Sequence, residues 1–322
     1  MSFKSVAARN AVLRIVGVIT AAAAALVSVS VSSALIVRAQ SAQRAAPLKV
    51  RLPDEAAGID GVVGALISVY DQFDVVALGE MHERKIDSDL RIALVRHPGF
   101  AKKVRTIVVE FATTTEQTIL DRYVRGENVS RAELKRVRPR QFGSLTSEDP
   151  MYGDFFEAVR EVNSRLPADA RIRVFGGEDN RNRDTAAVSI LKEQVFQKRG
   201  KALVIYGAAH FWRAGPNSKS TGMLGMVDIR YPGRTFAVIP VGGQRQEPRS
   251  TSQIPDYQKF DRALNTQVRP VLIPLQRLPF RDFKAADFLS GDVVTLSGGS
   301  IFTGSTLTLG QMADACVYFG RP

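Results

Sequence analysis

Short apolar runs recur along this chain, and most of them stop abruptly at a glycine or an acidic residue. The runs at 75–78, 106–109, 172–175 and 202–206 end at Gly79, Glu110, Gly176 and Gly207, respectively, and similar runs occupy 235–239 and 315–319. A strand that is buried on both faces is apolar throughout rather than alternating. The pattern therefore predicts a buried, mostly parallel sheet.

Stretches with helical spacing separate these runs. They cover residues 86–96 (followed by Pro98), 113–124 (with Thr113 as the expected N-cap), 131–137, 155–166 and 184–196. Strands that alternate with helices predict an α/β fold with helices on both faces of the sheet. The glycine-rich segment from residue 270 to 319 is expected to pack on the same sheet. A hydrophobic content of 45% is enough for a sizeable core.

The N-terminus has the features of an export signal. Three basic residues precede an uncharged apolar stretch at 15–37, and Val37-Arg38-Ala39 fits a cleavage rule with the cut before Gln40. The stretch is also long enough to cross a bilayer. We therefore expect an exported protein, periplasmic or secreted, that is either cleaved or anchored through residues 15–37. The predicted division is 1–39 signal or anchor, 40–53 linker and 54–322 a single α/β domain.

Charge and cysteine content limit the partners. Without the four basic residues of 1–39, the chain holds 40 basic and 32 acidic residues, a net charge of +8, and the basic residues are scattered. This pattern favours a soluble basic surface over nucleic-acid binding. Membrane contact is expected only through an uncleaved N-terminal segment. The single cysteine, Cys316, excludes an intramolecular disulfide, a cysteine-based zinc cluster and a lipid anchor near residue 39.

Two of the three histidines occupy the same kind of turn. They lie in Gly79-Glu80-Met81-His82 and Gly207-Ala208-Ala209-His210, each directly after an apolar run. Two other runs lead to Glu110 and to Glu178-Asp179. Sites in open α/β sheets form outside the carboxyl ends of the strands. If the four strands are neighbours, these side chains share one crevice.

Two chemistries suit such a crevice. His82, Glu110 and His210 could hold a divalent metal ion with an open position for water. Alternatively, His82 acts as general base on water and a carboxylate orients it. The expected substrate-binding residues, which include cations to stabilise an oxyanion, are Asp179, Arg181, Arg84 and Arg213. The sequence lacks a His-Glu-x-x-His helix, a Gly-x-Ser-x-Gly elbow and a glycine-rich phosphate loop.

These motifs resemble the superfamily that groups erythromycin-esterase-like proteins, ChaN-like haem-binding proteins and TIKI/TraB metalloproteases. The matching pieces are VVALGEMH at 75–82, IVVE at 107–110, RIRVFGGED at 171–179 and VIYGAAH at 204–210. The resemblance implies an α/β fold with a site at Glu80, His82, Glu110 and His210, and Asp179 as a further strand-end acid. It implies hydrolysis of an ester, lactone or peptide bond, or haem binding.

The chain also departs from these relatives. ChaN-like proteins carry further histidines after the first motif, where this chain has Glu83-Arg84-Lys85, and they carry a lipidation cysteine. Erythromycin-esterase-like proteins place one more residue between Glu and His, so antibiotic hydrolysis does not carry over. The sequence predicts an exported hydrolase of a small-molecule or peptide substrate. The alternatives are a haem- or metal-binding protein without turnover, with His82, His210 or Tyr206 as iron ligands, and a member that only binds a partner.

Overall fold

The computed structural model describes residues 52–82, 84–138, 150–179, 183–213, 222–243, 257–289 and 305–321. These residues belong to one compact unit, Lys49–Pro322. Within the described residues, no helix is long and apolar enough to cross a membrane. The predicted signal or anchor at 1–39 lies outside the described residues, as does the linker apart from Leu52 and Pro53.

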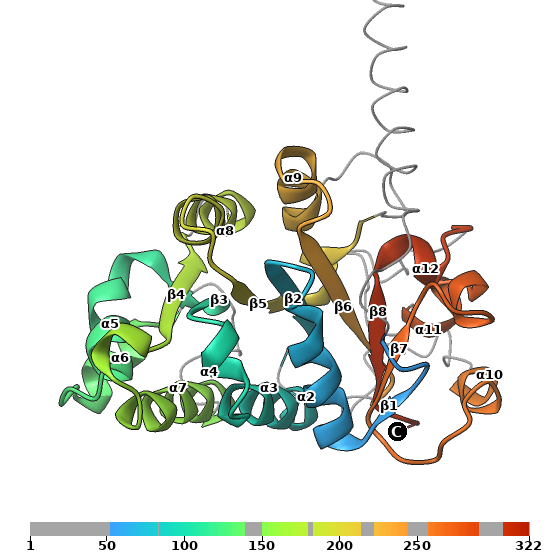
Figure 1. Ribbon diagram of the computed structural model, residues 1–322, viewed down its shortest axis with the longest axis horizontal. Helices are drawn as coiled ribbons and strands as arrows, with labels where there is room; N and C mark the ends of the chain where they lie inside the picture. The colour runs from blue at the N-terminus through green and yellow to red at the C-terminus, as the bar shows by residue number, and fades with distance from the viewer. Residues whose placement is uncertain are drawn as a thin grey trace, which may run out of the picture. The chain divides into compact units, whose positions relative to one another are not determined.

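The unit is built on one eight-stranded sheet with the order β1-β7-β8-β6-β2-β5-β3-β4 (Figure 1). The strands are β1 (Ala56–Ala57), β2 (Val75–Glu80), β3 (Thr106–Thr113), β4 (Arg173–Glu178), β5 (Ala202–Gly207), β6 (Thr235–Val241), β7 (Val271–Pro274) and β8 (Ala315–Tyr318). The strands from β8 to β4 pair in parallel, whereas β7 and β1 pair antiparallel. The predicted mostly parallel α/β sheet is confirmed, and the C-terminal segment joins it through β7 and β8.

Each predicted apolar run forms a strand that is buried almost throughout. β3 runs further than expected, to Thr113, because Phe111 and Ala112 are also buried. Thr113 is an N-cap as predicted, since its side chain accepts the Thr115 N–H, but it caps a 3-10 turn and not the α-helix. Thr113 is the last strand residue, a 3-10 turn follows at Thr114–Glu116, and helix α5 (Gln117–Val124) begins after it.

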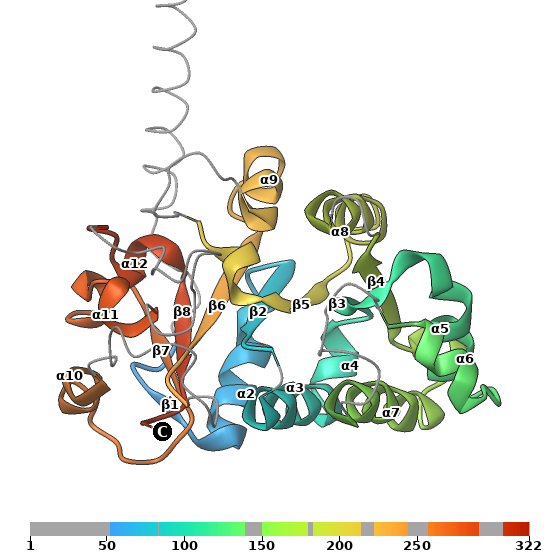
Figure 2. The same ribbon diagram turned by 180° about the vertical axis from the view of Figure 1, so that it is seen from behind.

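Helices cover both faces of the sheet, as predicted (Figures 1 and 2). On one face α2 (Gly58–Val69) contacts α3 (Lys85–Arg96), which packs against α7 (Pro150–Ser164). On the other face α8 (Arg183–Leu191) contacts α9 (Met223–Arg230). The sequence analysis predicted neither α2 nor α9. The other helices are α4 (Phe100–Lys103), α6 (Arg131–Arg136), α10 (Tyr257–Arg262), α11 (Ala286–Leu289) and α12 (Leu309–Met312).

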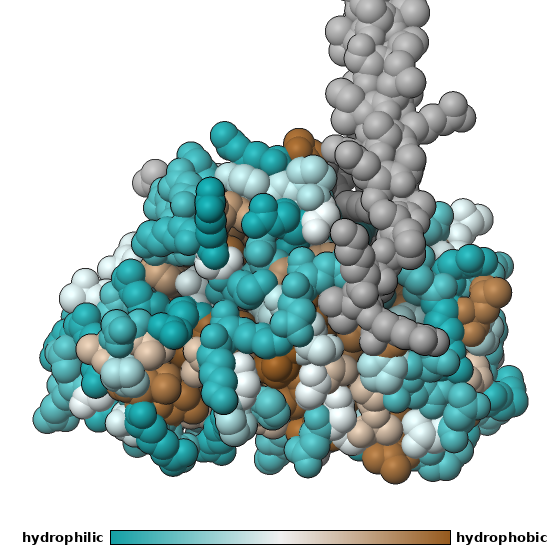
Figure 3. All heavy atoms as spheres, viewed as in Figure 1, coloured by the Kyte–Doolittle hydropathy of each residue, from teal (hydrophilic) through white to brown (hydrophobic). Residues whose placement is uncertain are grey.

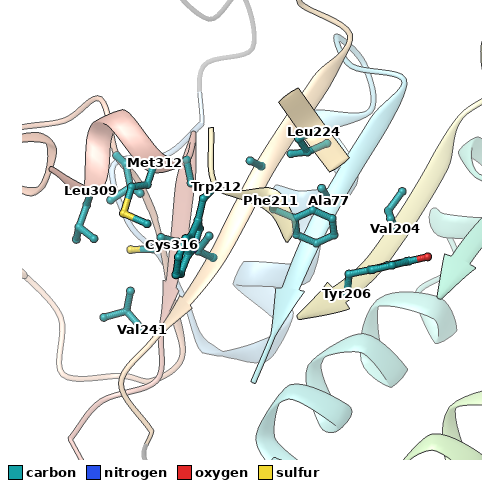
Figure 4. Close-up of a cluster of buried hydrophobic side chains, with 14 of the residues drawn as sticks. Ala77, Val204, Tyr206, Phe211, Trp212, Leu224, Val241, Leu309, Met312 and Cys316 are labelled. Carbon is teal, nitrogen blue, oxygen red and sulfur yellow. The ribbon is translucent and has the colours of Figure 1, made fainter. Parts of the chain in front are cut away.

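The core beneath α8 and α9 extends into the C-terminal segment (Figure 4). Ala77 and Val204 of the central strands, Leu224 of α9 and Met312 of α12 belong to one buried cluster. Cys316 lies fully buried in this cluster, and burial raises the pKa of its thiol. On the face seen in Figure 3, the described surface is mostly hydrophilic, with hydrophobic residues in separate groups. The C-terminal segment is thus part of the core that supports the central strands.

Candidate functional site

The two Gly-x-x-His turns lie next to each other at the carboxyl edge of the sheet. β2 and β5 are parallel neighbours, and their register aligns Gly79 with Tyr206 and Glu80 with Gly207. Each histidine follows its strand within three residues, so the register brings His82 and His210 to the same place. β5 is also paired with β3, which carries Glu110, and β3 is paired with β4. The predicted side-by-side arrangement of the four strand ends is confirmed.

Glu110 is the centre of this site. Its Oε2 accepts a hydrogen bond of 2.7 Å from the Gly207 N–H, and its Oε1 lies 3.3 Å from His210 Nε2. The ladder between β3 and β5 ends at Val109, and the pairing of β3 with β4 is irregular from Val109 to Thr113. Glu110 therefore directly follows the last regular pair of the ladder. Burial opposes ionisation, but hydrogen bonds and nearby imidazoles outweigh it and lower the pKa of Glu110 to about 2.

His210 lies between two carboxylates. Its Nδ1 is 2.6 Å from Asp184 Oδ1 in the first turn of α8, and its Nε2 faces Glu110. Burial would lower its pKa, but the bonds to Asp184 and Glu110 raise it to about 9. His210 is therefore an imidazolium at neutral pH. The sequence analysis missed Asp184, whose contact with a residue 26 positions later is fixed only by the way α8 packs.

His82 contacts Glu80 through one ring nitrogen and faces Glu110 with the other. Its Nδ1 lies 3.1 Å from Glu80 Oε1, and its Nε2 lies 3.9 Å from Glu110 Oε2. Glu80 in turn forms a buried ion pair with Arg91 of α3 and accepts a 3.0 Å hydrogen bond from the Tyr152 hydroxyl. Burial opposes its ionisation, but Arg91, His82 and Tyr152 outweigh that effect and lower the pKa of Glu80. The sequence analysis did not identify Arg91 or Tyr152.

Gly207 leaves room for this arrangement. A Cβ at Gly207 would lie 2.9 Å from His82 Nε2 and 3.4 Å from Glu110 Oε2. A distance below 3.0 Å is closer than real Cβ contacts allow. The glycine of the second turn therefore has a steric role, since any side chain there would displace the imidazole of the first turn.

Two arginines predicted to bind substrate have other contacts. Arg84 is buried, bonds both oxygens of Asp87, and donates to the carbonyl of Gly243 at 2.8 Å and to that of Gly242. These contacts occupy its guanidinium and join α3 to the end of β6. The prediction that Arg84 binds substrate is therefore corrected to a structural role.

Arg213 follows His210 by three residues, but its guanidinium has other partners. It forms ion pairs with Asp228 of α9 and with Asp314, and it donates to the carbonyl of Thr235, the first residue of β6. Asp314 directly precedes β8, so these partners lie at the amino ends of their strands. The prediction that Arg213 binds substrate is also corrected, because its side chain is largely buried and occupied by these two ion pairs.

The remaining predictions differ in outcome. Asp179 directly follows β4 and is partly buried, and its role in substrate binding stays a prediction. Arg181 lies outside the described residues. Within the part of the chain that the structure describes, no group of three or more His, Cys, Asp or Glu side chains is arranged to hold a metal ion. The predicted metal site at His82, Glu110 and His210 is therefore not found. The three side chains meet, but through contacts among themselves.

Comparison with known families supports the resemblance seen in the motifs. Residues 66–170 match the family described as haem-binding uptake, Tiki superfamily, ChaN. This segment, about a third of the chain, contains Glu80, His82 and Glu110, whereas His210 lies beyond it. The resemblance to the ChaN/Tiki superfamily is thereby confirmed. No curated protein matches the sequence.

Several solved structures are similar to parts of this chain. A Bacillus cereus protein shares 12% identity at a TM-score of 0.54, with 85% of this chain and 94% of that chain covered. The type III effector HopBA1 shares 15% identity at a TM-score of 0.42, with 66% and 93% covered. ChaN of Campylobacter jejuni, solved with cofacial haem, shares 14% identity at a TM-score of 0.36, with 58% and 87% covered. At these identities the Bacillus structure supports the fold alone.

Proposed function

We propose that this chain is a hydrolase of ester or peptide bonds, with a site made of His82, Glu80, Glu110 and His210. The observation that carries the proposal is the convergence of two imidazoles, each bonded to its own carboxylate, on one buried carboxylate. Such a carboxylate–imidazole pair is a common arrangement for a general base, because the carboxylate fixes the ring and its tautomer.

His82 is the proposed base. An ionised Glu80 only accepts hydrogen bonds, so in the proposed reaction His82 Nδ1 carries a proton and Nε2 acts as the base. The 3.9 Å between His82 Nε2 and Glu110 Oε2 exceeds a direct hydrogen bond. An oxygen atom beside this gap could contact both groups. In the proposed reaction a water in that position gives one proton to Nε2 as its oxygen bonds to the substrate carbonyl carbon. The same proton then passes to the leaving group as the acyl bond breaks.

Glu110 and His210 have supporting roles in this scheme. The Glu110 carboxylate stays ionised at neutral pH and accepts a hydrogen bond from the second O–H of the water, which keeps that hydrogen. His210, whose pKa is raised to about 9, carries a positive charge that keeps the buried Glu110 ionised. Asp184 fixes the His210 ring. His82 and His210 have side chains that are 28% and 23% exposed, so a substrate can reach them.

The test is hydrolysis of a panel of esters and peptides by the wild type and by His82→Ala, His210→Ala and Glu110→Gln. His97→Asn is the matched control, because His97 is the C-cap of α3 and its Nδ1 accepts the local Gly99 N–H. We expect a loss of roughly a hundredfold or more in kcat for the site variants and no change for the control. Equal activity of all variants on every substrate would refute the proposal.

The family description favours haem binding as a second candidate function. The site residues fit haem poorly in this arrangement. His210 has both ring nitrogens directed at carboxylates, and His82 Nε2 faces Gly207 and Glu110 closely. Tyr206 is fully buried. Titration with hemin tests this candidate: a Soret band that shifts in the wild type and not in His82→Ala would support it, and no shift at micromolar hemin would exclude it.

We also propose that the protein is exported to the periplasm or secreted, on the basis of its basic N-terminus and the apolar stretch at 15–37. Fractionation of cells that express the full chain tests this. A shorter protein in the periplasm or medium would support cleavage, the full-length protein in the membrane would support an anchor, and full-length protein in the cytoplasm would contradict export.

A further inference from the structure

The connections that lead into four neighbouring strands of the sheet are rich in lysine and arginine. Residues 97–105 lead into β3, 165–172 into β4, 197–201 into β5 and 230–234 into β6. Together these connections, which we call the amino edge, hold ten basic residues and one acidic residue, Asp169. The basic residues are Lys102, Lys103, Arg105, Arg165, Arg171, Lys198, Arg199, Lys201, Arg230 and Arg234. They look scattered in the sequence because each connection holds only two or three of them.

The parallel register of the sheet brings the four connections together. The first paired residues of five neighbouring strands form one row across the sheet (Figure 1): Thr235, Val75, Ala202, Thr106 and Arg173. Just before this row, the Asp74 N–H donates to the Arg234 carbonyl at 3.0 Å, and the Arg173 N–H donates to the Arg105 carbonyl at 2.9 Å. Since neighbouring strands lie about 4.8 Å apart, the row from β6 to β4 is only about 20 Å wide.

Carboxylates neutralise only part of the amino edge. Four of the ten basic residues form ion pairs: Lys103 with Asp71, Arg165 with Glu161, and Lys201 and Arg234 with Asp74. Among the described residues, no carboxylate pairs with the other six: Lys102, Arg105, Arg171, Lys198, Arg199 and Arg230. Arg105 donates to two backbone carbonyls and Lys198 to the amide oxygen of Gln194, so both keep their net charge. Of the six, all but the half-buried Arg171 are exposed.

An exposed apolar side chain stands beside these charges. Ile229, in the last turn of α9, is 62% exposed and directly precedes Arg230. Tyr231 stacks on Phe196 with 3.9 Å between the ring centroids, and both rings are half-buried. The stack joins the end of α9 to the connection that leads into β5. Cations that surround apolar and aromatic side chains are typical of surfaces that lie in the head-group layer of a membrane.

We propose that the amino edge is a docking surface for an anionic lipid bilayer. Each lysine or arginine near such a bilayer strengthens binding about fivefold, and the six cations without a carboxylate partner act together. A nucleic acid would also attract them, but it has no apolar layer for Ile229. This contact goes beyond the N-terminal segment, through which alone the sequence predicted membrane contact.

The predicted N-terminal organisation is compatible with this contact. If the apolar stretch at 15–37 is retained as an anchor, it holds the domain beside a bilayer. The predicted linker at 40–53 spans up to about 45–50 Å when extended, so the amino edge can turn toward the head groups. If the segment is cleaved, the amino edge alone makes the contact.

Docking by the amino edge leaves the candidate site accessible. His82 and His210 follow the carboxyl ends of β2 and β5, which have six residues each. A strand rises about 3.3 Å per residue, so the site lies about 15–20 Å further from the bilayer than the amino edge. A dissolved substrate would reach it there, but neither the docking nor its test depends on hydrolysis.

The first test locates the contact by hydrogen–deuterium exchange of the full chain. Exchange is compared between vesicles of phosphatidylcholine and vesicles of an equal mixture of phosphatidylcholine and phosphatidylglycerol. We expect the amides of the amino edge to be protected by the mixed vesicles only, and the turns that carry His82 and His210 to exchange equally in both. An N-terminal anchor is present in both samples, so it does not produce this difference. Equal exchange of the amino edge in both vesicles would overturn the inference.

The second test removes charge from the amino edge. Lys198→Gln with Arg230→Gln should lower the ratio of affinities for mixed and neutral vesicles about 25-fold, from about fivefold for each charge. Arg131→Gln with Lys135→Gln is the matched control, since both residues are exposed in α6, and Val137, directly after α6, bonds to the carboxyl end of β3. The control should leave the ratio nearly unchanged. An equal fall in both double variants would show that net charge alone matters and would refute the docking surface.

Two further measurements separate a membrane from a nucleic acid. Ile229→Ser should weaken binding to mixed vesicles severalfold without changing the binding of a short DNA duplex, because only the bilayer offers an apolar layer. At 1 M salt, where the screening length is about 3 Å, the preference for mixed vesicles should disappear. Tighter binding of the duplex than of the vesicles, lost in Lys198→Gln with Arg230→Gln, would assign the surface to nucleic acid instead.

Discussion

The change Gly207→Ala tests the site without removing any functional group. The backbone at Gly207 has φ −50° and ψ 135°, a conformation that alanine adopts readily. The added Cβ would lie 2.9 Å from His82 Nε2, whereas ordinary contacts begin near 3.4 Å. The His82 ring must therefore move by about half an ångström or more. Misplacement of a reacting group on this scale costs up to about a hundredfold in rate.

We therefore expect kcat of Gly207→Ala to fall by about ten- to a hundredfold on any ester or peptide that the wild type hydrolyses. The free energy of unfolding should stay within about 1 kcal/mol of wild type, because the loss of unfolded-state entropy offsets part of the strain. Gly64→Ala is the control, since Gly64 is exposed in α2 and its Cβ would contact nothing within 4 Å. It should gain about 0.5–1 kcal/mol and keep full activity. Full activity in Gly207→Ala would refute the close packing of His82 that the mechanism requires.

Three further outcomes follow from the charges of the site. The pKa of Glu110 is lowered from 4.5 to about 2. Its ionisation should therefore contribute about 3 kcal/mol to the free energy of unfolding above pH 4.5, and this contribution should be lost as the pH falls toward 2. Urea unfolding of the wild type and of Glu110→Gln at several pH values checks this. The pKa of His210 is raised from 6.5 to about 9, so its contribution to the free energy of unfolding should be complete below pH 6.5 and be lost as the pH rises to 9. Asp184→Asn should lower that pKa, as measured by NMR titration, and an unchanged midpoint would contradict the assigned contact. Arg213→Met should cost about 3–5 kcal/mol, because the buried Asp228 loses its cation and the half-buried Asp314 loses its ion pair. The KM of the folded variant should stay the same, and a selective rise in KM would restore the predicted role of Arg213 in substrate binding.

The strands could be predicted because burial on both faces leaves a direct mark on the sequence. Runs such as 75–78 and 202–206 are apolar throughout, and both became central strands. Helices α2 and α9 could not be recognised in the same way. Seven of the twelve residues of α2 are apolar, and it is buried on much of its surface, so its polar face is narrow. α9 has only eight residues, too few for a clear period.

The sequence by itself determined which polar residues stand at the strand ends. Two Gly-x-x-His turns in a chain with three histidines, together with Glu80 and Glu110, identified the candidate site because strand ends are where parallel sheets place their sites. It could not determine the partners of those residues. Arg84 and Arg213 were expected near the substrate because cations suit an oxyanion, yet their partners in the fold are Asp87, Asp228 and Asp314.

Only the tertiary structure decided how the site is held together. Asp184, Arg91 and Tyr152 come from three helices, and no spacing in the sequence links them to His210 or Glu80. Their contacts depend on the angles at which α8, α3 and α7 pack against the sheet, and those angles result from many side chains together. The pKa values of Glu110 and His210 depend on the same packing, because burial and a few short contacts set them. Residue identity therefore located the two histidines, and packing gave each of them its own carboxylate partner.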